Sequence, residues 1–477
     1  MLISVILDVP DLFRPKAEFA IQTMFSAFFV DVCFYKNSDI NPSKEKTTIY
    51  YGCNADKFLN KSHICFQATL ETILYFEQFT PYELSGIHQV EQGEHAFAVL
   101  FGNRHYHQNC YHSDIFASAF FFLSDWQKMI NEKDEHGRSQ YSKSVQYYLN
   151  AAMRPLVNEY TDWLMELIST ETGLSAERKK WSGHNFAALI THDFDRIKKR
   201  YIGTYAREFV EIPFFNALNM PLKKRMQRLR LAIEDMLAAE DGYEKSIKNQ
   251  FQFEKEKGIR PTVLLKSIIK KHARDARDYL DYPFLDEIIA KITELNGEIG
   301  YHASYCAGYD KQLLEQELCQ LKKRLNRDIH SHRFHYLRYE PCYGLQLLEE
   351  NEIKTDSSVG WAEQSGYRTS FIFPHFIFDI RNNRVTSLVE VPMTLMDMQV
   401  FQYMDMNISE AVMCAKKQVD LAEKYGGIVV WNFHHHTLDK SETGDCDILF
   451  ENSLNYLHSK KPLYLTMGEI YDAFQIK

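Results

Sequence analysis

Acidic and imidazole side chains stand at or near the ends of apolar segments in the second half of this sequence. Asp193 and Asp195 close the segment AALITHDFD, and their spacing places both carboxylates on one side of an extended strand. One carboxylate could therefore bind a cation while its neighbour handles a proton. Carboxylates and imidazoles that converge suit a divalent metal ion with a coordination position open to water. Around later segments the chain continues with His302, His335, Arg338, Asp397, His434, His435 and His436.

The elements that must position these residues are short strands that alternate with helices. From residue 186 onward, apolar segments of four to seven residues alternate with helical patterns over 281–295, 311–325 and 409–425. About seven such units predict a parallel sheet closed into a distorted (β/α) barrel, with a doubly wound sheet as the second choice. The carboxyl ends of barrel strands carry the catalytic side chains, which brings the residues above together. The predicted strands are AALIT, RPTVLL, GEIGYH, FHYLRY, SFIF, SLVEVPM and GGIVVWNF.

Two further regions accompany the predicted barrel, which spans residues 180–477. Residues 1–165 mix short strands with helices and predict a separate N-terminal α/β domain packed on the barrel. Residues from about 196 to 257 predict a basic helical insertion between the first two barrel strands. Because it leaves from the catalytic end of a strand, we expect it to act as a lid. Its Lys and Arg clusters predict solvated helix faces or, alternatively, a basic rim that attracts an anionic polymer.

Composition limits the class of protein. The 477 residues include 55 basic and 64 acidic side chains, for a net charge of −9, which excludes attachment to nucleic acid by bulk charge. The strongest apolar run covers only residues 115–123, whereas a bilayer requires about 20 residues, so we expect no integral membrane segment. Nine scattered cysteines without a CxxC pair, and an N-terminus without a basic region before its apolar stretch, predict a cytoplasmic location.

The ordered series of these motifs resembles the polysaccharide deacetylase superfamily, the NodB homology domain of carbohydrate esterase family 4. It is most similar to a subgroup with an extra N-terminal domain, found among bacterial surface-polysaccharide genes. The resemblance is carried by THDFD (191–195), EIGYHASY (298–305), HYLR (335–338), the segment 356–368, EVPMTLMD (390–397), WNFHHHTLD (431–439) and, near the N-terminus, EKDEHGR (132–138).

The resemblance implies a metal-dependent hydrolase that removes an N-acetyl or related acyl group from a sugar, with a free, nucleotide-linked or lipid-linked saccharide as its partner. It assigns Asp193 as the general base and Arg338 as the residue that holds this base. It assigns His434 as the histidine of the last motif, the expected donor of a proton to the leaving amine. Asp397 is expected to orient the imidazole of His434.

The expected cofactor is a divalent metal ion, with Zn²⁺ preferred because imidazoles and a carboxylate suit it. The resemblance assigns Asp195 and His302 as two of its ligands. The second histidine of the usual HxxxH ligand pair falls on Cys306, so His335 is the preferred third ligand, with Cys306 and His332 as alternatives.

Two other functional interpretations remain open. A catalytically degenerate barrel could bind a glycan or act as a scaffold, and the cysteine at position 306 favours this reading. The same site could instead act as an esterase or amidase on a substrate that is not a sugar. The segment with Trp361, Glu363 and Arg368 predicts either a substrate-contact loop or a local pair between Arg368 and Glu363.

Overall fold

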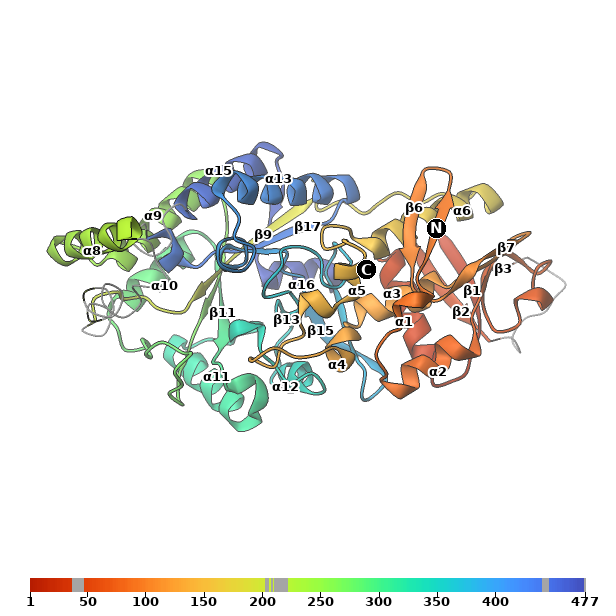
Figure 1. Cartoon of the computed structure of the whole chain (residues 1–477), viewed down its shortest axis with the longest axis horizontal. Coiled ribbons are helices and arrows are strands. Elements are labelled where there is room, and N and C mark those ends of the chain that lie inside the picture. The colour runs from red at the N-terminus through yellow and green to blue at the C-terminus, as the bar shows by residue number, and fades with distance from the viewer. Residues whose placement is uncertain (37–46, 202–205, 207–208, 210–221, 440–445, 476–477) are drawn as a thin grey trace.

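The computed structural model describes residues 1–36, 47–201, 206, 209, 222–439 and 446–475. Two β-sheets, each accompanied by helices, lie side by side along the long axis of the molecule (Figure 1). The first sheet belongs to the N-terminal third of the chain, and the second collects the strands that follow residue 186. Among the described residues no helix is both long and apolar enough to cross a membrane.

The second sheet curls into an open (β/α) barrel, which confirms the predicted fold class. Its strands are parallel except β14, which runs antiparallel to β15. Neighbouring strands follow the order β14-β15-β13-β12-β11-β10-β9-β17-β16, and β18 pairs with the start of β9. Their bounds are β9 (Ala187–Phe194), β10 (Thr262–Leu265), β11 (Glu298–Ala303), β12 (Ser331–Phe334), β13 (Thr355–Asp356), β14 (His375–Asp379), β15 (Arg384–Glu390), β16 (Leu395–Met396), β17 (Ile428–Asn432) and β18 (Leu463–Tyr464).

Helices connect successive strands of this sheet, and polar caps fix where several of them begin and end. Asn407 and Glu410 form a capping box at the start of α13, and Gly426 ends that helix in the left-handed conformation. Asp310 caps the start of α11, where its side chain accepts from the backbone N–H of Leu313. The helices are α8 (Leu222–Leu237), α9 (Gly242–Lys257), α10 (Phe284–Glu294), α11 (Lys311–Leu325), α12 (Gly344–Glu350), α13 (Ile408–Tyr425), α15 (Cys446–Ser459) and α16 (Met467–Gln475).

Two predicted barrel strands are wrong. The segment FHYLRY begins where β12 ends, because Tyr336 and Leu337 adopt positive φ angles of 61° and 54° that no strand can accommodate. The segment SFIF is irregular, although Phe371 and Ile372 are fully buried. The amide of Ile372 donates to the side chain of Asn158 instead of to a neighbouring strand. The apolar composition of SFIF therefore indicated correctly that the segment is buried, but it did not indicate a strand.

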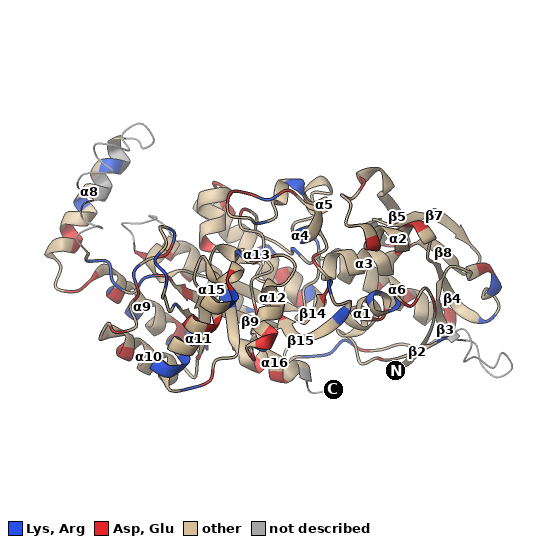
Figure 2. Cartoon of the chain, turned by 90° about the horizontal axis from the view of Figure 1, so that it is seen from below, with Lys and Arg blue, Asp and Glu red and all other residues tan. Residues whose placement is uncertain are grey.

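The helical insertion does not cover the site as a lid in the part of the chain that the structure describes. Helix α8 projects away from the barrel in both views (Figures 1 and 2). The root of the insertion is held to the protein, because Lys199 pairs with Asp439 at 2.6 Å and Arg200 donates to the carbonyl of Asp235 at 2.6 Å. Lys199 and Arg200 therefore anchor the insertion to the protein. They belong neither to a solvated helix face nor to a basic rim that attracts an anionic polymer. Helix α9 returns to the barrel through a fully buried pair between Glu254 and His192 at 2.6 Å.

The first sheet is parallel apart from its edge hairpin. Its order is β2-β1-β3-β4-β8-β7, with β7 antiparallel to β8, and a separate hairpin joins β5 and β6. Strands are β1 (Leu2–Asp8), β2 (Asp31–Tyr35), β3 (Thr47–Gly52), β4 (Ser62–Gln67), β5 (His88–Gln92), β6 (His95–Val99), β7 (Gly102–His107) and β8 (Cys110–Ser113). Helices are α1 (Arg14–Phe25), α2 (Leu70–Gln78), α3 (Ile115–Leu123), α4 (Gln127–Ile130), α5 (Val145–Tyr148) and α6 (Leu156–Thr172).

One hydrophobic cluster runs through both sheets. It contains α3, whose nine residues are all buried, and continues through Phe378 to Trp431 in the barrel. The rings of Phe120 and Phe378 lie 5.1 Å apart across this junction. The two sheets thus share a core, and the division of the chain into two domains near residue 165 stays a prediction.

Candidate active site

The carboxyl ends of five neighbouring strands meet at a cleft of about 220 Å³. Each strand end supplies a side chain to it, as expected for a barrel of this type. The residues come from β9, β10, β11, the turn after β12 and the turn after β17, and they are Asp193, Asp195, Lys266, His302, His335 and His434.

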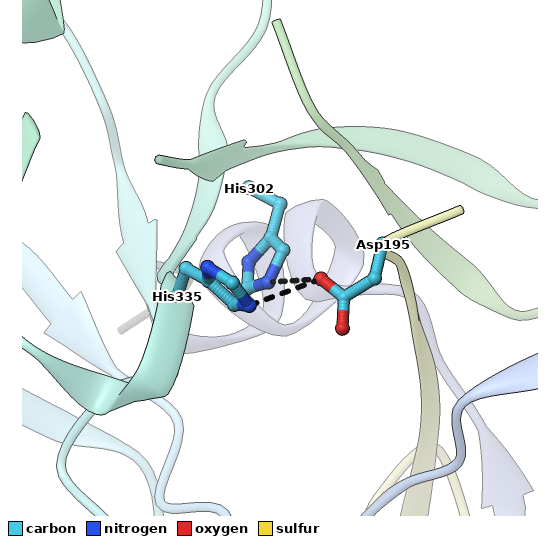
Figure 3. A group of neighbouring side chains, drawn as sticks. All are labelled: Asp195, His302 and His335. Atoms are coloured by element: carbon cyan, nitrogen blue, oxygen red, sulfur yellow. Dashed lines mark ion pairs between the residues drawn. The ribbon is translucent and has the colours of Figure 1, made fainter. Parts of the chain in front are cut away.

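Asp195, His302 and His335 form a compact group that could hold a metal ion. One possible ligand atom from each lies within 4.8 Å of the other two. The Oδ1 atom of Asp195 is 3.5 Å from Nε2 of His302 and 3.3 Å from Nε2 of His335 (Figure 3). Two imidazoles and one carboxylate match the ligand set of open zinc sites.

The ring nitrogens of both histidines are arranged to bind a cation. Nδ1 of His302 lies 2.9 Å from the backbone carbonyl of Arg333, which can only accept, so the proton is on Nδ1. In the neutral ring, Nε2 of His302 then carries the lone pair, and this atom is buried with no hydrogen-bond partner among the described residues. Nδ1 of His335 lies 2.8 Å from a carboxylate oxygen of Asp275. This contact places the proton on Nδ1 and leaves Nε2 to face the candidate metal site. The residues present therefore fit a divalent cation.

The two alternative ligands lie elsewhere. Nδ1 of His332 lies 2.7 Å from Oδ1 of Asp356, and this pair is fully buried. Cys306 precedes a short 3-10 helix, and its side chain packs against the apolar cluster of the barrel. The geometry therefore favours His335 as the third ligand, as the sequence resemblance preferred.

Asp193 is held as a charged carboxylate beside this group. It is 3% exposed and accepts from Arg333 at 2.8 Å and from Asn432 at 2.9 Å. Burial alone would raise the pKa of Asp193, but the Arg333 guanidinium and the nearby imidazoles lower this pKa to about 2. Its Oδ2 lies 3.8 Å from Nε2 of His302 and 3.9 Å from Nε2 of His434, on the edge of the candidate metal group.

The predicted contact between Arg338 and Asp193 is wrong. Arg338 donates to the carbonyl of Tyr305 at 2.7 Å and stacks over the rings of Tyr305 and Tyr309. Arg333 makes the contact that was expected of Arg338. β12 ends at Phe334, so Arg333 is still a strand residue, and its guanidinium donates to Asp193.

His434 is oriented by Asp397, as expected. Its Nδ1 lies 2.7 Å from Oδ1 of Asp397, a fully buried carboxylate that also accepts from the backbone of His434. Burial would lower the pKa of His434, but Asp397 raises it to about 9, with smaller contributions from Asp195 and Asp193. The imidazole is thus protonated at neutral pH and can act as an acid. His435 is directed away, against the rings of Phe194 and Tyr243, whereas His436 also lines the cleft.

Lys266 is a cation that sequence reasoning missed. Its ammonium group is buried, 2.8 Å from Oδ1 of Asp195 and 3.4 Å from Oδ1 of Asp275. Burial would raise the pKa of Asp195, but Lys266, followed by His335 and His302, holds it well below the ordinary value. Lys266 directly follows β10, so the strand-end rule could have found it. Asp275 and Asn432 gave no such signal, since one lies in a loop and the other belongs to an apolar strand.

The N-terminal segment 132–138 reaches the same cleft. Nδ1 of His136 lies 3.0 Å from the hydroxyl of Tyr305, and Arg138 donates to the carbonyl of Tyr336 at 3.2 Å. Arg138 and Tyr336 both line the cleft. Tyr336 itself has a φ of 61°, a conformation that costs a non-glycine residue about 1–2 kcal/mol. That strain is concentrated where the HYLR motif meets the cleft.

Comparisons with known proteins give partial likenesses. Residues 5–172 match a family of unknown function, DUF7033, which covers the first sheet. The chain matches no curated protein.

Solved structures resemble the chain only distantly. A protein from Mycobacterium smegmatis provisionally named a polysaccharide deacetylase shares 16% identity over 62% of this chain and 93% of its own, with a TM-score of 0.41. PuuE allantoinase shares 13% over 61% of this chain and 91% of its own, with a TM-score of 0.42. Agd3, described as a novel carbohydrate deacetylase, shares 8% over 99% of this chain and 87% of its own, with a TM-score of 0.31. These likenesses are too weak to assign an activity.

Proposed function

We propose that this protein is a metal-dependent hydrolase that removes an N-acetyl or related acyl group from a sugar in bacterial surface-polysaccharide metabolism. The observation that carries the proposal is the pair of buried histidines whose Nδ1 atoms are held by acceptors and whose Nε2 atoms face Asp195, beside Asp193 and His434. Asp195, His302 and His335 would hold the ion, with Zn²⁺ preferred. A cytoplasmic location belongs to the same proposal, and cell fractionation tests it.

The chemistry is hydrolysis of an amide by water. A divalent cation, when bound, polarises the acyl oxygen and makes a nearby water more acidic. Asp193 accepts the proton of the attacking water, and Arg333 and Asn432 hold this carboxylate in one orientation. The C–N bond then breaks, and His434 donates its Nε2 proton to the leaving amine nitrogen. Asp397 holds the ring of His434 with this nitrogen directed into the cleft.

Lys266 supports a second candidate function. Its ammonium group already neutralises Asp195 at 2.8 Å, as a resident cation would. A degenerate barrel that binds a glycan without hydrolysing it would have such a substitute for the metal. The side chain of Lys266 also has an alternative partner in Asp275, 3.4 Å away, which would take the ammonium when a metal occupies Asp195.

A metal titration separates the two candidates. Purified protein should bind about one equivalent of Zn²⁺ and release acetate from an N-acetylated oligosaccharide, and both should be lost in Asp195→Ala. The variant Lys266→Met removes the competing ammonium and should bind Zn²⁺ at least as tightly as wild type. If the wild type binds no Zn²⁺ while Lys266→Met does, the degenerate barrel is the better description.

A further inference from the structure

Four lysine and arginine side chains line the cleft, and only two of them have a close carboxylate partner. Lys266 is paired with Asp195, and Arg138 is paired with Asp134 at 2.7 Å. Arg196 and Arg274 have no such strong partners. Arg196 is exposed and makes no ion pair or hydrogen bond through its side chain with the described residues. Arg274 is half exposed and lies 3.7 Å from Glu135, beyond hydrogen-bond distance.

The position of these two arginines gives them access to a bound substrate. Arg196 directly follows the candidate metal ligand Asp195 in the chain. Arg274 precedes Asp275, the carboxylate that orients His335. Both therefore stand at the mouth of the cleft, next to the residues that hold the candidate metal site. An arginine with no carboxylate partner, such as Arg196, or with only a distant one, such as Arg274, is suited to bind a carboxylate or phosphate through two parallel hydrogen bonds.

The charge balance of the cleft points in the same direction. Its acids, Asp193 and Asp195, are compensated by Arg333 and Lys266. A neutral sugar would leave Arg196 without a counter-ion, and Arg274 with only its 3.7 Å pair to Glu135, beside a divalent cation. An anionic substituent on the sugar would remove this excess of positive charge, and electrostatic attraction would also speed its entry.

We propose that the cleft takes an acylated sugar that carries an anionic group, a carboxylate or a phosphate, and that Arg196 and Arg274 bind that group. The proposal rests on the proposed deacetylation, because it places the acyl amide at the candidate metal site. Tyr336 and Tyr403 also line the cleft, and aromatic rings can pack against the apolar faces of a sugar.

Equilibrium binding to the zinc-loaded full-length protein tests this proposal without relying on turnover. Three probes are compared by calorimetry: tetra-N-acetylchitotetraose, which is neutral, N-acetylmuramic acid, which carries a carboxylate, and N-acetylglucosamine 6-phosphate. At least one acidic probe should bind about 10- to 100-fold more tightly than the neutral one, since charge-assisted hydrogen bonds are the strong ones. Preference for one acid over the other then assigns the group as a carboxylate or a phosphate. Higher salt should reduce this preference.

Matched variants assign the preference to the two arginines. Arg196→Gln with Arg274→Gln should abolish the preference and leave zinc content unchanged. Arg230→Gln with Arg384→Gln removes the same charge from surface pairs outside the cleft, and this double variant should keep the preference for the acidic probes. The proposal is overturned if the first double variant keeps the preference, if the neutral probe binds as tightly as both acids, or if neither acid binds. If the wild-type protein shows the preference for acidic probes but releases no acetate, only the proposed hydrolysis is contradicted.

Discussion

Asp193 lies near the end of β9 and Asp195 just after it, yet their surroundings give the two carboxylates different tasks. Asp193 accepts hydrogen bonds from Arg333 and Asn432, so protein groups alone hold it. Asp195 faces the Nε2 atoms of His302 and His335, which could bind a cation. Metal retention and proton transfer should therefore be separable by mutation.

Asp193→Asn should keep the metal and lose most of the turnover. The amide can still accept from Arg333 but cannot take a proton from water, and loss of a general base costs a factor of about 10²–10⁴ in kcat. Metal analysis and steady-state kinetics on an N-acetylated sugar measure the two effects. Asp195→Ala is the comparison, because it should lose metal and activity together. A fully active Asp193→Asn protein would exclude Asp193 as the base.

Asp397→Asn should shift the alkaline side of the pH profile. His434 works in its protonated form, so kcat should fall as the pH rises through the pKa of His434, about 9. Asp397 is the largest of the groups that raise this pKa, and without its charge the remaining burial lowers it. The alkaline limb of kcat against pH should therefore move to lower pH in the variant, by about one unit or more. An unchanged limb would mean that His434 is not the acid.

The sequence could identify several of these side chains but not all of their partners. Asp193, Asp195 and His302 were recognisable because each closes an apolar strand. The resemblance of the HYLR motif assigned the guanidinium beside Asp193 to Arg338, whereas β12 ends at Phe334 and Arg333 makes this contact. For Arg368 the sequence left open a substrate-contact loop or a local pair with Glu363, but the side chain binds Asp125, a contact across 243 residues that no local pattern encodes.

At the scale of elements, the turn after β12 decides where the third imidazole points. His335 follows the last strand residue, and Tyr336 and Leu337 then reverse the chain with positive φ angles. A continuous strand would place His335 and Arg338 on opposite faces of the sheet. The turn therefore frees His335 to face Asp195, while Arg338 leaves for the rings of Tyr305 and Tyr309.

Paired substitutions at Tyr336 should reveal the strain of this turn. Tyr336→Gly and Tyr336→Ala lose the same ring, but only glycine adopts positive φ without cost. The glycine variant should therefore be the more stable of the two, by about 1 kcal/mol in the free energy of unfolding. Denaturant unfolding measures this difference. At Lys291, inside α10, the order should reverse, because glycine costs about 1 kcal/mol relative to alanine in a helix. Equal stabilities at Tyr336 would show that the turn is not strained.

At the scale of the whole molecule, a buried ion pair joins the two sheets. Arg368 donates to both carboxylate oxygens of Asp125, at 3.0 and 2.8 Å, and stacks over the ring of Trp361 at 4.6 Å. The side chains are only 5% and 3% exposed. Asp125 follows α3 of the first sheet, and Arg368 belongs to the barrel, so the pair spans the shared core.

Asp125→Asn should destabilise the entire protein. The substitution leaves Arg368 as a buried charge without its counter-ion, which costs about 3–5 kcal/mol. Chemical denaturation followed by fluorescence should show a lower midpoint for the whole protein and not for one half. Glu350→Gln, which breaks an exposed pair with Lys311, is the control and should change the free energy of unfolding by about 0–1 kcal/mol. A variant in which only one of two separate transitions moves would show that the sheets unfold independently.

The common core of the two sheets also bears on how such a protein could have evolved. A module joined by a linker can be exchanged between proteins, because few apolar groups face the joint. Here the rings of Phe120 and Phe378 meet across the joint, and α3 is buried on all sides. Separation of the halves would expose this aromatic surface to water and promote self-association. Substitutions in one half must therefore be compatible with the other, so the two halves should have been inherited together rather than shuffled.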